Sequence, residues 1–220
     1  MATPRDAFAL IPGLIVGYLG YRLANRIRAE FRVRSGPAEA ADISLPLFFK
    51  SDEDYTTAIR TAYPQVSAEL AQRIIEVARN VGADPFALAN LINFESAGFN
   101  PKAINYNANG TIGAVGLIQW RATTANDFGL TLQQLLQMSA VEQMTHVEHY
   151  LMRYVKSKGP LNTPQRLAMA VFYPAAITKA PDYLFPGNIA DTNSGIQTPA
   201  DYVAYVARNA KLPNNVPLYA

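Results

Sequence analysis

Apolar residues recur every three or four positions through the middle of the chain, which is the spacing of one face of an α-helix. The clearest such stripe consists of Val66, Leu70, Ile74, Val77 and Val81. Further along, Thr131 and Ser139 each stand three residues before a Gln or Glu, a capping box that marks the start of a helix. Strand-like alternation is nearly absent, so any sheet is expected to be small, such as a hairpin around residues 110–116. The pattern predicts a mainly α-helical fold.

The first 35 residues differ from the rest of the chain in hydropathy and in charge. Residues 7–21 are uncharged and mostly apolar, and residues 1–35 hold six Arg against one Asp and one Glu, a net charge of +4. The remaining residues carry a net charge of −2, so nucleic-acid binding by the main domain is not expected. The apolar run is shorter than the roughly 20 residues of a membrane-spanning helix, but snorkelling of Arg22 would extend it.

We interpret residues 1–35 as an N-terminal apolar helix with a basic collar that associates with a membrane. A buried core helix is one alternative. A cleaved signal peptide is another, which is disfavoured because the basic residues follow the apolar run instead of preceding it. Downstream, prolines and an acidic cluster indicate a connector over residues 36–64. A helical domain is expected over residues 65–180, with residues 181–220 as an extension that packs on it.

Glu95 occupies an unusual position for a carboxylate. The helix expected over residues 85–95 begins after Asp84, a good N-cap, and on it Glu95 shares one face with Leu91 and Ile92. The local sequence, residues 86–101, contains no Lys or Arg that could pair with it. Burial without a cation raises the pKa of a carboxyl group, and a carboxyl that stays protonated near neutral pH can act as a general acid. The alternative is a structural carboxyl bonded to a backbone amide.

One motif begins at this glutamate and a second follows it. The sequences ESAGFNPKA at residues 95–103 and GAVGLIQ at residues 113–119 resemble, in order and spacing, the motifs of goose-lysozyme-like lytic transglycosylases. The resemblance extends over residues 66–180 and implies a lysozyme-like helical catalytic domain that needs no cofactor. It implies cleavage of the β-1,4 bond between N-acetylmuramic acid and N-acetylglucosamine in peptidoglycan glycan strands.

The resemblance also implies roles for single residues. Glu95 would be the catalytic acid, and Ser96 would help to orient its carboxyl group. Gln119 would bind sugar in the cleft, and Gly116 would let the backbone approach the glycan, as a residue without a Cβ permits.

The spacing of carboxylates bears on the mechanism. Most glycosidases use two carboxylates, yet no Asp or Glu stands between Glu95 and Asp127. A single carboxyl group suffices if Glu95 protonates the leaving oxygen and then takes the proton of the muramoyl 6-hydroxyl, whose oxygen attacks C1. The product would be a 1,6-anhydro sugar, and the pKa of Glu95 is expected to rise toward ~6. The alternatives are a hydrolytic muramidase of the same fold and an inactive structural or wall-binding protein.

Two aromatic residues depart from the family pattern. The family usually carries an Ala-Tyr-Asn-Ala-Gly-like motif, whereas residues 170–176 read AVFYPAA and lack the Asn. Tyr173 is expected to take the aromatic role, with its hydroxyl bonded to the Glu95 carboxyl or to substrate; the alternative is a core aromatic. Trp120 is interpreted either as a platform for sugar stacking or as a core residue.

Metal binding is not expected from the sequence. The absence of Cys excludes disulfides, thiol nucleophiles and Cys-ligated zinc. His146 and His149 have no third ligand at metal-site spacing. A calcium-loop-like stretch begins at Asp191, but its Gly comes one place early and Tyr202 stands where a Glu ligand belongs.

The motifs look most like those of phage-associated members of the family. This resemblance implies a virion protein, held in a membrane or ejection channel through residues 1–35, that opens the cell wall in the host periplasm. The alternative location is the bacterial inner membrane, facing the periplasm.

Overall fold

The computed structural model describes residues 51–191, 193 and 195–213. The apolar helix and membrane segment predicted for residues 1–35 lie outside these residues. Within the described part of the chain, no helix is both long and apolar enough to cross a membrane.

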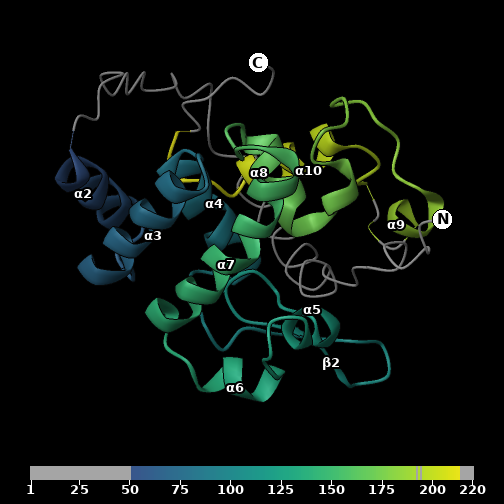
Figure 1. The fold of residues 1–220 in the computed structure, drawn as a ribbon, viewed down its shortest axis with the longest axis horizontal. Coiled ribbons are helices and arrows are strands. Elements are labelled where there is room, and N and C mark those ends of the chain that lie inside the picture. Colours follow the sequence, from purple (N-terminus) through teal and green to yellow (C-terminus); the bar gives the residue numbers. More distant parts are fainter. Residues whose placement is uncertain (1–50, 192, 194, 214–220) are drawn as a thin grey trace, which may run out of the picture.

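The described chain is mainly helical, as predicted, and contains one small hairpin (Figure 1). Its elements are α2 (Asp52–Ala62), α3 (Ala68–Asn80), α4 (Pro85–Glu95), β1 (Ile104–Tyr106), β2 (Ile112–Val115), α5 (Ala122–Asn126), α6 (Leu132–Gln137), α7 (Ala140–Lys158), α8 (Pro164–Phe172), the 3₁₀ turn η1 (Pro174–Ala176), α9 (Gly187–Ala190) and α10 (Pro199–Ala207). The two strands pair antiparallel, with Ile104 opposite Val115 and an irregularity after Asn105.

Side-chain caps fix the beginnings of several helices where the sequence predicts them. Asp84 accepts a hydrogen bond from the backbone N–H of Ala87 at 2.9 Å and so caps α4. The capping boxes that start at Thr131 and Ser139 are both present, at α6 and α7. Each cap satisfies amide groups that would otherwise have no partner in the first turn.

Residues 52–62 form a helix within the stretch that the sequence analysis interprets as a connector. Ser51 and Asp54 form a capping box at its start, and the acidic cluster lies in its first turn, where negative charge is favourable. Ile59 and Tyr63 are fully buried against the rest of the core. The acidic run, interpreted as part of a connector, is the N-terminal turn of a largely exposed helix that buries Ile59.

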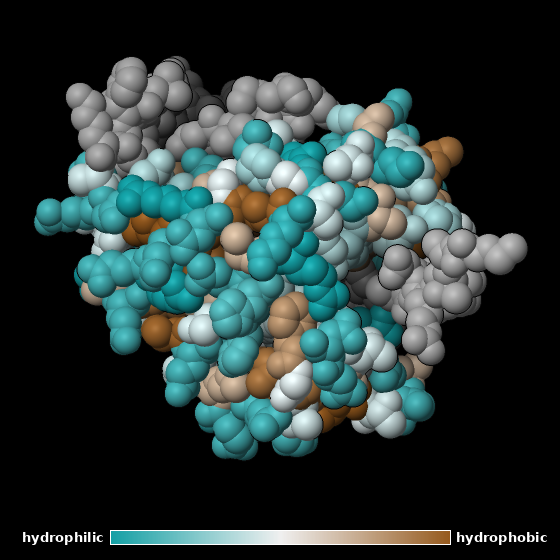
Figure 2. All heavy atoms as spheres, viewed as in Figure 1, coloured by the Kyte–Doolittle hydropathy of each residue, from teal (hydrophilic) through white to brown (hydrophobic). Residues whose placement is uncertain are grey.

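Helix α7 is the longest of the described helices and lies near the middle of the view in Figure 1. Helix α3 packs on α7 and on α2, while α4 contacts α3, α8 and α10. In Figure 1, α8 and α10 lie together at the top and α5, α6 and β2 lie at the bottom. On the face shown in Figure 2, hydrophobic residues occupy small areas among hydrophilic ones, because most of the apolar stripes are buried.

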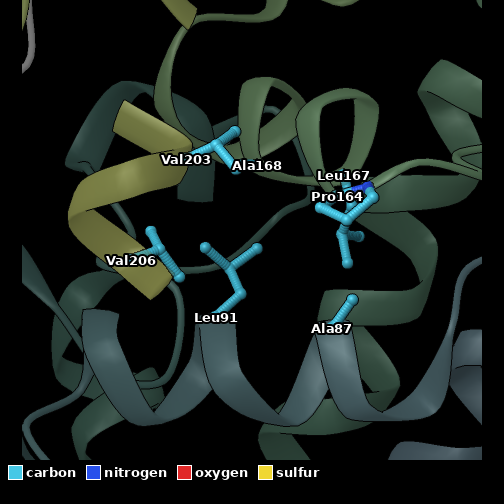
Figure 3. A pocket seen from close by; sticks show the side chains of 7 residues that line it. All are labelled: Ala87, Leu91, Pro164, Leu167, Ala168, Val203 and Val206. Atoms are coloured by element: carbon cyan, nitrogen blue, oxygen red, sulfur yellow. The ribbon is translucent and has the colours of Figure 1, made fainter. Parts of the chain in front are cut away.

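Helix α10 belongs to the predicted C-terminal extension and packs on α8 and α4. Its Val203 and Val206 are buried and face Leu91 of α4 across a small hollow (Figure 3). The whole lining is apolar: Ala87, Leu91, Pro164, Leu167, Ala168, Val203 and Val206. Since a sugar requires hydrogen-bonding partners, this hollow is a gap in helix packing and not a glycan site.

Candidate active site around Glu95

Glu95 is the last residue of α4, and its carboxyl group lies against α10. The Tyr202 hydroxyl donates a hydrogen bond to Oε1 of Glu95. The residue keeps some contact with solvent, but its carboxyl group is strongly desolvated. Burial raises the pKa of Glu95 to about 7, and the hydrogen bond from Tyr202 lowers it in part. The carboxyl group can therefore exist in both protonation states near neutral pH.

Tyr202 belongs to the site, although the sequence pattern did not indicate that it contacts Glu95. Its ring is 1% exposed and stacks on Phe172 of α8, with ring centroids 4.1 Å apart and an interplanar angle of 22°. Burial and the neighbouring Glu95 raise the pKa of its phenol well above the usual value, so the hydroxyl keeps its proton and acts as a donor. The capping box of Thr198 with Asp201 was an available signal for the helix that carries it.

Tyr173, predicted to bond either the Glu95 carboxyl or substrate, lies elsewhere. It ends α8 as the C-cap, and its ring meets Phe185 edge-on, with centroids 5.6 Å apart. The hydroxyl bonded to Glu95 is that of Tyr202. The chain leaves helical geometry at Tyr173, where φ is −148° and ψ is 87°. A contact between this half-buried tyrosine and substrate stays a prediction.

Ser96 acts on the end of the helix instead of on the carboxyl group. It is the C-cap of α4, is fully buried, and its hydroxyl donates to the carbonyl oxygen of Ile92 at 2.6 Å. The chain then reverses through Ala97 and Phe99, two non-glycine residues with positive φ of 51° and 65°. Such conformations are strained and persist where the surrounding structure holds them. Ser96 thus fixes the last turn of α4, from which Glu95 projects.

The loop over residues 116–119 is tied to the segment that follows Glu95. The backbone N–H of Gly116 donates to the carbonyl of Ala103 at 2.8 Å. Gln119 has a φ of 55°, and its Nε2 donates to the carbonyl of Gly116 at 3.1 Å. The Gln119 side chain is partly exposed and could therefore reach a ligand. Sugar binding by Gln119 stays a prediction.

The fold requires a glycine at position 116, independently of any ligand. The φ of Gly116 is 77°, and a Cβ at this position would collide with the side-chain amide of Gln143. The close packing of this amide accounts for the glycine without any glycan. An approach of the glycan to Gly116 stays a prediction.

Gln143 is a second residue that the sequence analysis missed. From α7, its buried amide donates from Nε2 to the carbonyls of Pro101 at 2.7 Å and Leu135 at 2.8 Å, and Oε1 accepts from the N–H of Leu117 at 3.0 Å. One side chain thereby joins the segment after Glu95, the 116–119 loop and the end of α6. Pro101 and Leu117 are distant from Gln143 in sequence, so local spacing gave no signal for this role.

Trp120 is a core residue in this structure. Its indole is 1% exposed and contacts the rings of Phe128 and Tyr150 edge-on, at centroid distances of 5.9 Å and 5.4 Å. A sugar can stack only on an exposed ring face, and the buried Trp120 ring has none. The substrate-binding role assigned to Trp120 gives way to the alternative of a core residue.

Among the described residues, no group of three or more His, Cys, Asp or Glu side chains could hold a metal ion. His146 and His149 face each other on α7 with ring centroids 6.4 Å apart. Their neighbour Glu148 instead bonds Arg73 and Asn80 of α3. The calcium-like stretch that begins at Asp191 includes residues outside the described part of the chain.

Comparison with known proteins bears directly on this arrangement. Residues 72–154 match the family model of the transglycosylase SLT domain. The match supports the lytic transglycosylase family and a peptidoglycan-directed activity of that general type. Neither the curated proteins nor the solved structures yield a match to the chain.

The SLT match includes Glu95, the 116–119 loop and Gln143, and it ends before α8 and α10. Tyr202 therefore comes from outside the matched segment and completes the surroundings of a carboxyl group within it. The site depends on both parts of the chain.

The raised pKa of Glu95 predicts a pH dependence for any reaction in which this group serves as a general acid. Because a general acid must carry its proton, the rate of such a reaction, glycan cleavage included, is expected to fall as the pH rises through about 7. Initial rates of clearing of purified sacculi, measured from pH 5 to pH 9, check this. A decline centred near the ordinary carboxyl value of 4.5 would contradict the desolvated state of the group.

Tyr202→Phe is expected to move that decline to higher pH. The substitution keeps the ring stacked on Phe172 but removes the hydrogen bond that lowers the pKa of Glu95, which then rises above about 7. The measurement is the same pH profile of clearing rate. Tyr205→Phe is the matched control, because this tyrosine also lies on α10 and contacts Phe94 without donating to Glu95. Identical profiles for the two variants would contradict the prediction.

Proposed function

We propose that the protein is a peptidoglycan lytic transglycosylase that cleaves the β-1,4 bond between N-acetylmuramic acid and N-acetylglucosamine and leaves a 1,6-anhydromuramoyl end. The observation that carries the proposal is the Glu95 carboxyl group, whose pKa of about 7 suits both donation and removal of a proton. Its position within the segment that matches the SLT domain supports this reaction over other acid–base chemistry.

The proposed reaction needs one carboxyl group. Protonated Glu95 donates its proton to the glycosidic oxygen as the bond to C1 breaks. The resulting carboxylate removes the proton of the muramoyl 6-hydroxyl, and that oxygen forms the new bond to C1. Glu95 is again protonated at the end, and no water is consumed.

The surroundings of Glu95 support a single-carboxylate mechanism. The pKa shift arises from burial and from Tyr202, and neither cause is a second carboxylate. An intramolecular nucleophile can have an effective molarity of roughly 10⁵–10⁸ M, which makes a protein nucleophile unnecessary. The hydrogen bond from Tyr202 would stabilise the carboxylate formed in the first step.

Clearing of purified sacculi by the full chain tests the proposal. The turbidity of a sacculus suspension is expected to fall with time at pH 6, where most Glu95 carboxyl groups are protonated. Sacculi that keep their turbidity at every pH from 5 to 9 would overturn the proposed activity.

We further propose that the protein is associated with a virion and a membrane through residues 1–35 and acts in the host periplasm, with the bacterial inner membrane as the alternative location. The apolar run and the +4 charge of this segment support binding to anionic lipid. Co-sedimentation with vesicles that contain anionic lipid, for the full chain and for a chain that lacks residues 1–35, tests the membrane part. Equal sedimentation of the two chains would contradict it.

A further inference from the structure

The last described residues of the chain are bound to the middle of α4 by a buried side-chain amide. Asn90 donates from Nδ2 to the carbonyl of Leu212 at 2.9 Å and accepts, at Oδ1, the N–H of Leu212 at 3.3 Å. Asn90 is 1% exposed and Leu212 is 6% exposed. The amide thus pairs with both polar groups of one backbone residue, as a neighbouring strand would, inside the core.

Tyr63, the residue that follows α2 as its C-cap, strengthens the same connection. The Tyr63 hydroxyl donates to Oδ1 of Asn90 at 2.6 Å and accepts the N–H of Lys211 at 2.9 Å. The Lys211 ammonium lies over the Tyr63 ring, 5.6 Å from its centroid. Buried polar groups are costly when a partner is lost, so these bonds hold one arrangement of the segment.

Asn93 adds a contact one turn further along α4. Its Nδ2 donates to the carbonyl of Asn209 at 3.4 Å, just beyond the end of α10. Asn90 and Asn93 stand three residues apart and so lie on one side of the helix. We call the contacts of Asn90, Asn93 and Tyr63 with residues 209–212 the C-terminal tether.

The contact between Tyr202 and Glu95 joins α10 to α4, and the C-terminal tether joins the segment that follows α10 to α4 and to Tyr63. Asn90 precedes Glu95 on α4, and Leu212 follows Tyr202 and α10. Hydrogen bonds thus connect α4 to α10 and the segment after it at three places: Asn90 with Leu212 in the core, Asn93 with Asn209, and the Glu95 carboxyl group with Tyr202.

Apolar contact alone fixes α10 less firmly. Val203, Val206 and Leu91 are buried and line the small hollow of Figure 3, so the contact between α10 and α4 there is made by apolar side chains alone. Such contacts are non-directional, whereas the paired amide bonds of the tether are directional.

We propose that Asn90 is a positioning residue for the reaction: by holding residues 211–212 it fixes α10, so that Tyr202 meets Glu95 and water is kept from the carboxyl group. The catalytic part of this inference rests on the proposed function. The positional part concerns the folded protein and can be measured without any activity.

Asn90→Ala tests the inference through the titration of Glu95. Loosening α10 lets water reach the carboxyl group, and because burial outweighs the Tyr202 bond, the pKa of Glu95 is expected to fall from about 7 toward 4.5. Carboxyl carbon NMR of the full chain labelled at Glu follows this titration, with Glu95→Gln assigning the signal. The alkaline decline of the clearing rate should move to lower pH in parallel, with a loss of roughly 10- to 100-fold at pH 6. A Glu95 that titrates as in the wild type would overturn the inference.

Two further variants separate positioning from general destabilisation. Tyr63→Phe removes one hydroxyl and keeps the ring against Phe99, and a smaller shift in the same direction is expected. If Asn90→Ala does not fold, Tyr63→Phe is the test, and an unchanged pKa of Glu95 in Tyr63→Phe would then overturn the inference. Gln165→Ala is the matched control, because this buried amide also bonds a backbone carbonyl, that of Lys179 at 2.8 Å, outside α10. It should lower the melting temperature without a pKa shift, and a shift equal to that of Asn90→Ala would overturn the inference.

The two readouts distinguish failure of this inference from failure of the proposed function. A chain that clears no sacculi but shows the shifted titration in Asn90→Ala would overturn the proposed function and support the tether. An active chain in which Asn90→Ala leaves the titration unchanged would do the reverse.

Discussion

Glu95→Gln is expected to lower the rate of sacculus clearing by roughly 10²–10⁴-fold, the usual contribution of a general acid. The amide keeps the shape of the side chain, and its oxygen can still accept the Tyr202 hydrogen bond, but it has no acidic proton to donate. Initial clearing rates at pH 6, with circular dichroism to establish that the variant is folded, measure the effect.

Glu142→Gln provides the matched control for this variant. Glu142 closes the capping box at the start of α7, and Gln serves equally well in that position. Its clearing rate should equal that of the wild type. A Glu95→Gln variant as active as this control would rule out Glu95 as the acid. An active wild type with an inactive Glu95→Gln would exclude a purely structural or wall-binding protein.

Trp120→Ala is expected to lower the free energy of unfolding by about 3–5 kcal/mol, the usual cost of truncating a large buried aromatic side chain. The indole lies between Phe128 and Tyr150, and its removal leaves a cavity that neighbouring side chains fill only in part. Urea denaturation of the full chain at pH 7, followed by circular dichroism, gives the difference.

Trp120→Phe separates the core role from the sugar-stacking role. A phenyl ring retains part of the packing, so this variant should be less destabilised than Trp120→Ala and should clear sacculi at nearly the wild-type rate. If Trp120 were a stacking platform, Trp120→Ala would instead lose activity while its unfolding free energy changed by less than about 1 kcal/mol, the range of most surface substitutions.

Local sequence signals predicted the framework of the site well. Asp84 marks the beginning of α4 because an N-cap acts within its own first turn, and the same holds for the capping boxes of α6 and α7. The position of Glu95 on the apolar face of α4 predicted its desolvation, and the pKa of about 7 is somewhat higher than the expected value of ~6.

Residues that act across long sequence separations could not be predicted in this way. Tyr202 is 107 positions from Glu95, and Gln143 is 42 positions from Pro101 and 26 from Leu117. Periodicity shows which face of a helix is apolar, but it does not show which other helix meets that face. The hydrogen bond between Tyr202 and Glu95 therefore could not be predicted from the sequence pattern.

Spacing also did not distinguish residues that contact substrate from residues that hold the site together. Ser96, Gly116 and Trp120 lie within or beside the family motifs, yet their contacts in the structure are with the Ile92 carbonyl, the Gln143 amide and two core rings. A motif records that a residue type is required at a position. Whether the requirement comes from the fold or from the ligand depends on burial, which the motif does not contain.

Mass spectrometry of the fragments released from sacculi by the full chain tests the central proposal most directly. A lone Glu95 with an intramolecular nucleophile predicts muropeptides that end in 1,6-anhydromuramic acid, each lighter by one water than its hydrolytic counterpart, and the absence of these fragments with Glu95→Gln. Release of hydrolytic fragments alone would contradict the proposed mechanism and identify a muramidase that admits water.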